Sequence, residues 1–147
     1  MKIKRILAVI LCLVMMLSCI PAVAFAATEP VVYLDSVNGS DSNTGLTEDQ
    51  AVATLTAAYT VAKNNIGSAS RAKIVLVNDY TFTFTKDKGK TRDIAGVDHS
   101  FEMVITGKTP QTALQFHLYD QCFIGMKGPT TFENITVRIS EDSASTY

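Results

Sequence analysis

The chain has 147 residues, of which 47% are hydrophobic and 18% are charged, and its 13 basic and 14 acidic residues give a net charge of −1. This length suits a single domain. After residue 26 the sequence is acidic and has no cluster of lysines and arginines, which argues against nucleic acid as a partner.

The N-terminal segment 1–26 has the pattern of a secretory signal peptide. Basic residues precede an apolar run from Ile6 to Leu17, and small residues favour cleavage after Ala26. A lipoprotein signal ending at Cys19 is the rival interpretation, which the bulky residues before the cysteine disfavour. An uncleaved membrane anchor needs about 20 apolar residues, and Pro21 breaks the run. We therefore predict a secreted or cell-surface protein that meets the membrane only transiently.

Cleavage changes the charge and the cysteine content. It removes three basic residues, which leaves 13 − 3 = 10 basic against 14 acidic residues and a net charge of 10 − 14 = −4. It also removes Cys12 and Cys19, so Cys122 remains alone. A single cysteine in an exported chain predicts no internal disulfide and no cysteine-based metal site.

The stretch from Tyr33 to Lys63 predicts a strand, an ordered loop and a helix. The apolar run Val31 to Leu34 is typical of a strand, and the segment Asp35 to Gly45 is rich in turn-forming Gly, Asn, Asp and Ser. The segment Thr47 to Gln50 matches a capping box, which predicts that the helix begins there. Apolar residues at helical spacing then form one face that must cover an apolar surface: Val52, Leu55, Tyr59, Ala62 and Ile66.

Two further strands and a polar loop follow. The run Ile74 to Val77 is continuously aliphatic, and the residues from Thr81 to Thr85 alternate with period two, so both are predicted strands. The segment 86–93 mixes charges of both signs, which is typical of a solvated loop.

The last third of the chain contains an internal repeat. The segment Asp98 to Phe101 aligns with Asp120 to Phe123 at a spacing of 120 − 98 = 22. Gly107 aligns with Gly128 at a spacing of 128 − 107 = 21. A unit of strand, turn and strand that recurs at this spacing fits one coil of a β-solenoid, whose strands pair in parallel with those of the next coil. An antiparallel sandwich is the structural alternative.

The repeat also predicts how side chains stack and how the two ends are covered. The helix sits where an N-terminal cap belongs, whereas only a short polar segment follows Ile139. We therefore expect an incomplete C-terminal end, with the chain being an N-terminal fragment or pairing with another chain. The predicted inward rows are Leu114, Phe116 and Leu118 over Ile135, Val137 and Ile139, and the outward rows are Gln115 and His117 over Thr136 and Arg138.

These residues carry a family resemblance. The segments Tyr33 to Asp35, Asn38 to Thr47 and Ala51 to Leu55 resemble the entry of right-handed parallel β-helix proteins of the pectate-lyase-like superfamily, and Thr131 to Val137 resembles a coil motif of that family. The resemblance implies a secreted bacterial protein and a mainly β fold. That fold is a right-handed parallel β-helix (solenoid) in residues 27–147, with an N-terminal amphipathic capping helix and an incomplete C-terminal end. It does not imply one function, because lyases, hydrolases and adhesins share this fold.

The polar loop offers candidate metal ligands. Oxygen atoms of Asp35, Asn38, Asp41 and Asn43 are of the type that Ca²⁺ binds, but the spacing is not that of an EF-hand. Turn hydrogen bonding that braces the loop is the favoured interpretation.

The repeat supplies candidate ligand-binding residues. Asp98 and Asp120 are expected to stack on adjacent coils, although aspartate is also common in turns. His117 and Arg138 are predicted on the outer surface, without the setting of a nucleophile or a general base. We therefore assign no catalytic residue.

The predicted function is that of an exported cell-surface or secreted segment, non-catalytic on its own, that binds a polysaccharide or cell-wall glycan in the manner of an adhesin. The alternative is the N-terminal portion of a polysaccharide lyase or glycoside hydrolase whose active site lies further along a longer chain.

Overall fold

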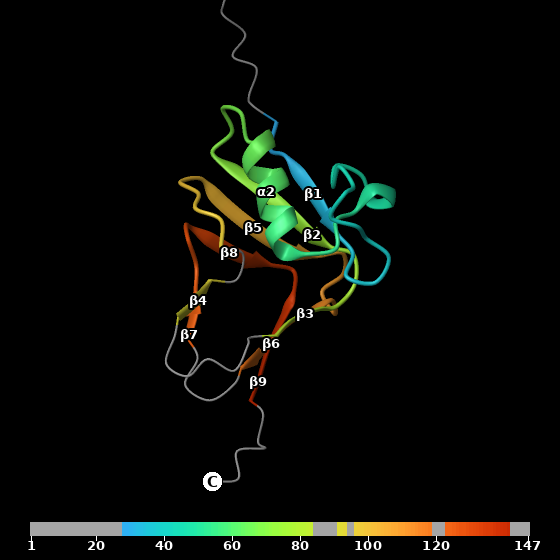
Figure 1. Cartoon of the computed structure of the whole chain (residues 1–147), viewed down its shortest axis with the longest axis vertical. Coiled ribbons are helices and arrows are strands. Elements are labelled where there is room, and N and C mark those ends of the chain that lie inside the picture. The colour runs from blue at the N-terminus through green and yellow to red at the C-terminus, as the bar shows by residue number, and fades with distance from the viewer. Residues whose placement is uncertain (1–27, 84–90, 94–95, 119–122, 142–147) are drawn as a thin grey trace, which may run out of the picture.

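The computed structural model describes residues 28–83, 91–93, 96–118 and 123–141 (Figure 1). The predicted signal peptide, residues 86–90 of the charged loop, Asp120 and Cys122 lie outside these ranges. Every strand pairing within them is parallel, so the alternative of an antiparallel sandwich is wrong. Within the same ranges, no helix combines the length and the apolar character that a bilayer crossing requires.

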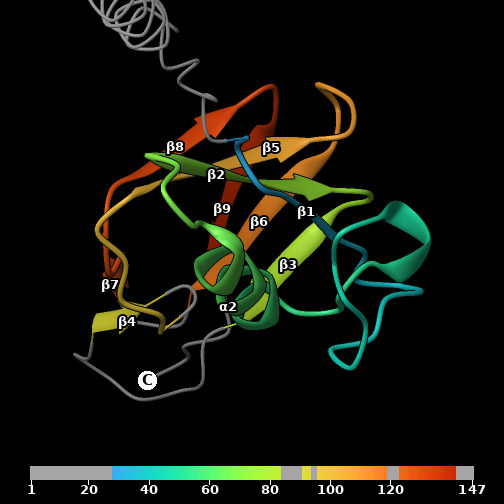
Figure 2. The ribbon, with the colours of Figure 1, turned by 90° about the horizontal axis from the view of Figure 1, so that it is seen from above.

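The strands form three parallel sheets, here called A, B and C (Figures 1 and 2). Sheet A consists, in order, of β1 (Val31–Leu34), β2 (Arg71–Leu76), β5 (Glu102–Gly107) and β8 (Thr130–Glu133). Sheet B consists of β3 (Tyr80–Thr83), β6 (Ala113–Leu118) and β9 (Thr136–Glu141). Sheet C pairs β4 (Thr91–Asp93) with β7 (Phe123–Gly125).

Alternating apolar residues build a core that sheets A and B share. In β2, Ala72, Ile74 and Leu76 are fully buried, while the residues between them are half-buried. This period-two pattern turns one face of the strand inward, and each large side chain buried there stabilises the fold by about 1.5–3 kcal/mol. The other strands add further buried side chains: Val32, Leu34, Met103, Ile105, Leu114 and Phe116.

The helix α2 (Leu55–Asn65) packs one face against β1 and β2 (Figure 2). The predicted apolar face is confirmed for most of its length, although Ile66 is only partly buried. The helix is also tied to sheets B and A, because the backbone N–H of Leu55 donates to the Tyr80 hydroxyl at 3.2 Å and the Tyr59 hydroxyl lies 3.4 Å from that of Thr130. The buried residues of α2 are Leu55, Ala58, Tyr59 and Ala62.

The predicted start of this helix at the capping box is wrong. Thr47 precedes only the short 3-10 helix η1 (Glu48–Gln50), and its side chain makes no capping bond. Val52 instead forms a parallel bridge with Leu34. This bridge keeps the backbone between η1 and α2 extended. The helix begins at Leu55, where the Thr54 hydroxyl accepts a hydrogen bond from the N–H of Ala57 at 3.2 Å.

The predicted repeat does not describe how the strands pair. Leu114 lies opposite Val137, not Ile135, so the register of β6 and β9 is shifted by two residues from the prediction. Phe123 pairs with Thr91 in sheet C and is therefore not stacked on Phe101. A two-residue shift leaves every side chain on the same face of its strand, so the apolar alternation cannot detect it.

The predicted fold class is also wrong. Paired residues are 102 − 71 = 31 positions apart between β2 and β5, but only 130 − 103 = 27 between β5 and β8 and 136 − 113 = 23 between β6 and β9. No solenoid with a fixed coil length is found in the described ranges. Parallel sheets with a packed helix fit an α/β-like fold, and they replace the predicted mainly β right-handed parallel β-helix with a capping helix and an incomplete end.

Candidate functional site

The predicted metal-binding loop is held by hydrogen bonds to its carboxylates. Asp35 Oδ1 accepts from the N–H groups of Val37 and Asn38 at 2.8 and 2.9 Å and from Asn78 Nδ2 at 2.7 Å. The Asn38 N–H does most to lower the pKa of the Asp35 carboxyl; burial opposes this, and the other donors add to it. Asp35 is therefore a structural anion that fixes the turn after β1.

The other predicted metal ligands also bind protein groups. Asp41 Oδ1 accepts from the N–H groups of Ala53 and Thr54 at 2.9 and 2.8 Å, and Asn43 Nδ2 donates to the Ala51 carbonyl at 2.9 Å. The donors to Asp41 use carboxylate lone pairs that Ca²⁺ would otherwise need, while Asn43 contributes an amide N–H group to the loop. In the part of the chain that the structure describes, no three His, Cys, Asp or Glu residues form a group that could hold a metal ion.

The structure describes one member of the predicted aspartate pair, Asp98. The Asp98 side chain is 81% exposed and lies 3.8 Å from Lys127 Nζ. Asp120 lies outside the described residues. The strand β7, which begins at Phe123, pairs with β4 in sheet C.

The structure does bring His117 and Arg138 onto one surface. In sheet B, Gln115 lies opposite Arg138 and His117 lies opposite Ser140, while Thr81 of β3 lies opposite Gln115 on the other side. We call these five residues the outer face of sheet B. Because side chains alternate along each strand, they project away from the core side, where the neighbouring Leu114 and Phe116 are buried.

Hydrogen bonds order this face. Gln115 Nε2 donates to Ser140 Oγ at 3.2 Å, and the same hydroxyl lies 3.3 Å from His117 Nδ1. Arg138 is exposed beside them. The face therefore presents hydroxyl, amide, imidazole and guanidinium groups, and each of these can hydrogen-bond to a hydroxylated ligand. Sequence reasoning missed Ser140, because its place opposite His117 depends on the register.

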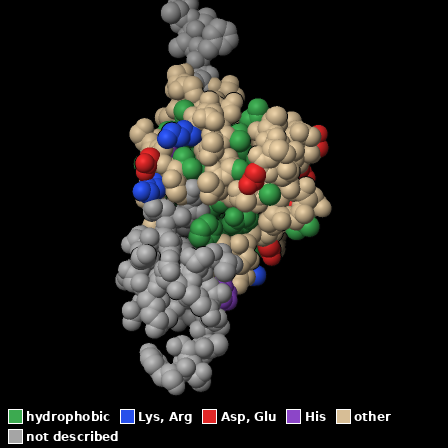
Figure 3. All heavy atoms as spheres, in the orientation of Figure 1, with side chains coloured by type: hydrophobic (Ala, Val, Ile, Leu, Met, Phe, Trp, Pro, Cys, Tyr) green, Lys and Arg blue, Asp and Glu red, His purple; other side chains and the backbone are tan. Residues whose placement is uncertain are grey.

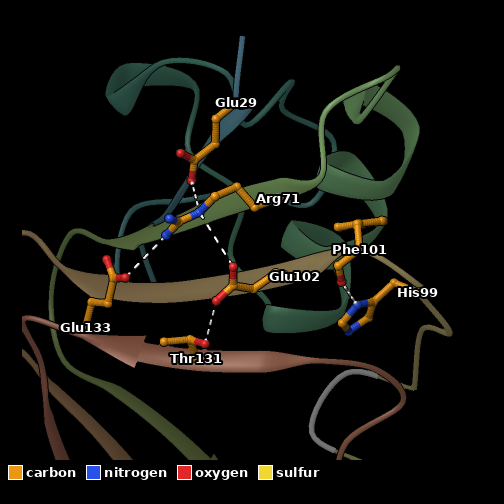
Figure 4. Close-up of polar contacts among 7 residues, drawn as sticks. All are labelled: Glu29, Arg71, His99, Phe101, Glu102, Thr131 and Glu133. Carbon is orange, nitrogen blue, oxygen red and sulfur yellow. Dashed lines mark hydrogen bonds and ion pairs between the residues drawn. The ribbon is translucent and has the colours of Figure 1, made fainter. Parts of the chain in front are cut away.

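A second polar group, which sequence reasoning missed, lies on sheet A (Figure 4). The Arg71 guanidinium lies 3.4 Å from a Glu29 oxygen, 3.2 Å from a Glu133 oxygen and 3.9 Å from a Glu102 oxygen. Thr131 donates to Glu102 at 2.7 Å. Arg71 thereby joins β2, β5 and β8 to the segment before β1, which is a structural role; each partly exposed pair adds about 0–1 kcal/mol.

Figure 3 shows how charged side chains are distributed on one face of the molecule. On the face shown in Figure 3, the coloured lysine and arginine side chains form no continuous basic patch.

Comparison of the chain with known proteins gives no match to a family model, to a curated protein or to a solved structure. Hence no pectate-lyase-like relative is identified, and a functional assignment depends on the site geometry.

Proposed function

We propose that this chain is an exported, non-catalytic binding module that engages a polysaccharide or cell-wall glycan through the outer face of sheet B. The observation that carries the proposal is the row of hydrogen-bonding side chains on paired strands. Gln115 and His117 each contact Ser140, and Arg138 lies opposite Gln115 on the next strand. The signal-peptide pattern of residues 1–26 supports export.

The spacing of the sheet supports a repeating ligand. Side chains on one face recur about every 4.8 Å across paired strands and about every 6.6 Å along a strand. A glycan chain lying on this face would meet several donors and acceptors at once. Each contact is weak alone, and their sum provides the affinity. Arg138 adds a preference for glycans that carry carboxylates or sulfates.

The test is affinity electrophoresis of the exported chain in gels that contain neutral or acidic polysaccharides, including pectin. Arg138→Ala and His117→Ala should each lower the affinity calculated from the retardation by about tenfold, because each removes one charged or hydrogen-bonding group. Lys73→Ala is the matched control, because it removes a positive charge from β2 of sheet A. Equal retardation of all variants, or turnover of a polysaccharide by this chain, would contradict the proposal.

A further inference from the structure

The three sheets end on the same side of the molecule, in strands that have one partner each within the described ranges. In Figure 1, β8, β9 and β7 are the lowest strands of sheets A, B and C. Of these strands, β9 carries two exposed apolar side chains, Val137 and Ile139. A strand edge with such side chains is a template on which another strand can pair.

The backbone of β9 directs hydrogen-bonding groups to this open edge at alternate residues. The Thr136 N–H donates to the Thr112 carbonyl, next to β6, at 3.0 Å. In a parallel pair every second residue bonds to the neighbouring strand, so the residues between them turn their groups to the other side. The N–H and C=O groups of Val137, Ile139 and Glu141 therefore point away from β6. These three positions are symmetric about Ile139.

The opposite edge of sheet A is closed to another strand. The Tyr33 N–H of β1 donates to the Gly45 carbonyl at 2.8 Å, and the Tyr33 carbonyl accepts from the Val52 N–H at 3.0 Å. The Asp35 N–H donates to the Val52 carbonyl at 2.9 Å. The loop after β1 thus uses the outer backbone groups of this strand, and β8 of one copy cannot add to β1 of another. A two-fold pairing needs only the open edge of each copy.

Side-chain pairing selects one register for two copies of β9. A two-fold axis makes the two strands antiparallel, so that directly opposite residues lie on the same face. With Ile139 opposite Ile139 of the second copy, all three outward positions can exchange backbone hydrogen bonds, and Arg138 lies opposite Ser140. A shift of two residues places either Arg138 opposite Arg138, which is destabilising, or Ile139 opposite Glu141.

We propose that β9 pairs with β9 of a second copy, antiparallel and centred on Ile139, to form a two-fold symmetric dimer. The pairing joins the three strands of sheet B to those of the second copy. The outer faces of the two B sheets then lie on the same side of one continuous sheet. The proposal does not depend on glycan binding by that face.

Disulfide cross-linking tests the register. The three cysteines of the full chain are replaced by serine, and Arg138→Cys and Ser140→Cys are then made separately. In the dimer, residue 138 of one copy and residue 140 of the other have Cα atoms about 4.5 Å apart, which a disulfide can span. In a dimer of one variant the two cysteines are diagonal neighbours, about 7–8 Å apart between Cα atoms, beyond the usual range of a disulfide.

We expect a mixture of the two variants to form disulfide-linked dimers at least about tenfold faster than either variant alone. Each single variant is the matched control, because it contains the same cysteine and lacks only its partner. Absence of cross-linking in the mixture, or equal cross-linking by a single variant, would overturn the proposal.

The original chain provides a readout that needs no substitution. Pairing protects the outward amides of β9, so hydrogen exchange at Val137 and Ile139, followed by NMR, should slow at least about threefold as the protein concentration rises. The amide of Asp49, on η1, is the control and should exchange at a constant rate. Exchange at Val137 and Ile139 that does not depend on concentration would also overturn the proposal, and a dimer with such exchange would have its interface elsewhere.

Discussion

At the scale of single residues, Asp35 has the clearest electrostatic role. The residue is 9% exposed, and its carboxylate accepts hydrogen bonds from backbone and amide donors. Hydrogen bonds to an ionised carboxylate stabilise a fold more than neutral ones do. The turn after β1 therefore depends on the charge of Asp35 as well as on its shape.

Asp35→Asn should lower the free energy of unfolding at neutral pH by about 1–3 kcal/mol. The folded-state pKa of Asp35 lies below its ordinary value of 3.8, so the carboxylate stabilises the fold above that value, and this contribution is lost as the pH falls through the folded pKa. Urea unfolding of both proteins at pH values from about 7 down to about 3 should show that the difference in their stability shrinks in acid. Asp49→Asn, at an exposed position, is the control; a difference that persists unchanged in acid would contradict the role of Asp35.

Gly39 shows a second requirement at this scale. A Cβ atom at this position would come within 2.4 Å of the Asp35 carbonyl oxygen and 2.5 Å of that of Val52. Both are backbone atoms of the segments that form the β1–Val52 bridge, so they cannot move aside cheaply. The glycine is needed for close approach of two backbones, whereas the sequence suggested only its freedom in turns.

At the scale of elements, the loop and α2 are joined by Asp41. Its carboxylate accepts from the N–H groups of Ala53 and Thr54 and from the Thr54 hydroxyl. The Thr54 hydroxyl in turn caps α2 by accepting from Ala57. The side chain that was a candidate metal ligand is thus part of an extended helix cap.

Thr54→Ala should destabilise the fold by about 0.5–2 kcal/mol, the usual cost of losing an N-cap. Thr47→Ala, at the position where the capping box was predicted, should have much less effect because Thr47 makes no side-chain capping bond. Thermal unfolding of the two variants measures the difference. An equal or larger loss for Thr47→Ala would show that the helix begins where the sequence predicted.

The elements that could be predicted are those with a local signal. The strands β1 and β2 follow from short apolar runs, and β3 and the apolar face of α2 follow from periodicity. The helix start could not be predicted, because the competing bridge joins Val52 to Leu34 across the loop. The pairing of β6 with β9 was predicted, but its register was not, because a shift of two residues preserves the apolar pattern.

The candidate site likewise contains residues with a local sequence signal and residues whose positions depend on strand pairing. His117 and Arg138 were predicted on an outward surface, because alternation identifies the exposed face of each strand. Their partner Ser140 required the register. The Arg71 cluster was not predictable for a stronger reason, since it joins residues 29, 71, 102 and 133, whose proximity depends on the order of strands in sheet A.

At the scale of the whole molecule, β9 forms an edge of sheet B and is only partly covered. Val137 and Ile139 lie opposite the buried Leu114 and Phe116, yet they are 43% and 63% exposed. Both residues are on the predicted inward side of β9, and Ile135 of the same predicted row packs against the core. They remain exposed because no strand in the described ranges pairs with the outer edge of β9. Such an edge with apolar side chains favours strand pairing between molecules.

Ile139→Lys should therefore reduce concentration-dependent self-association of the chain, because a charge at an exposed edge opposes pairing. Sedimentation velocity over a range of protein concentrations measures this. Lys73→Ala, which leaves the edge unchanged, should behave like the original chain. Equal self-association of the original chain and of the Ile139→Lys variant would exclude β9 as the contact between molecules.

Amide chemical-shift mapping tests directly whether the outer face of sheet B binds a glycan. The labelled chain is titrated with oligosaccharides from the polysaccharide that retards it most strongly. We predict shifts that cluster at Thr81, Gln115, His117, Arg138 and Ser140. Shifts confined to sheet A or to the loop after β1, or no shifts with any oligosaccharide tested, would contradict glycan binding by the outer face of sheet B.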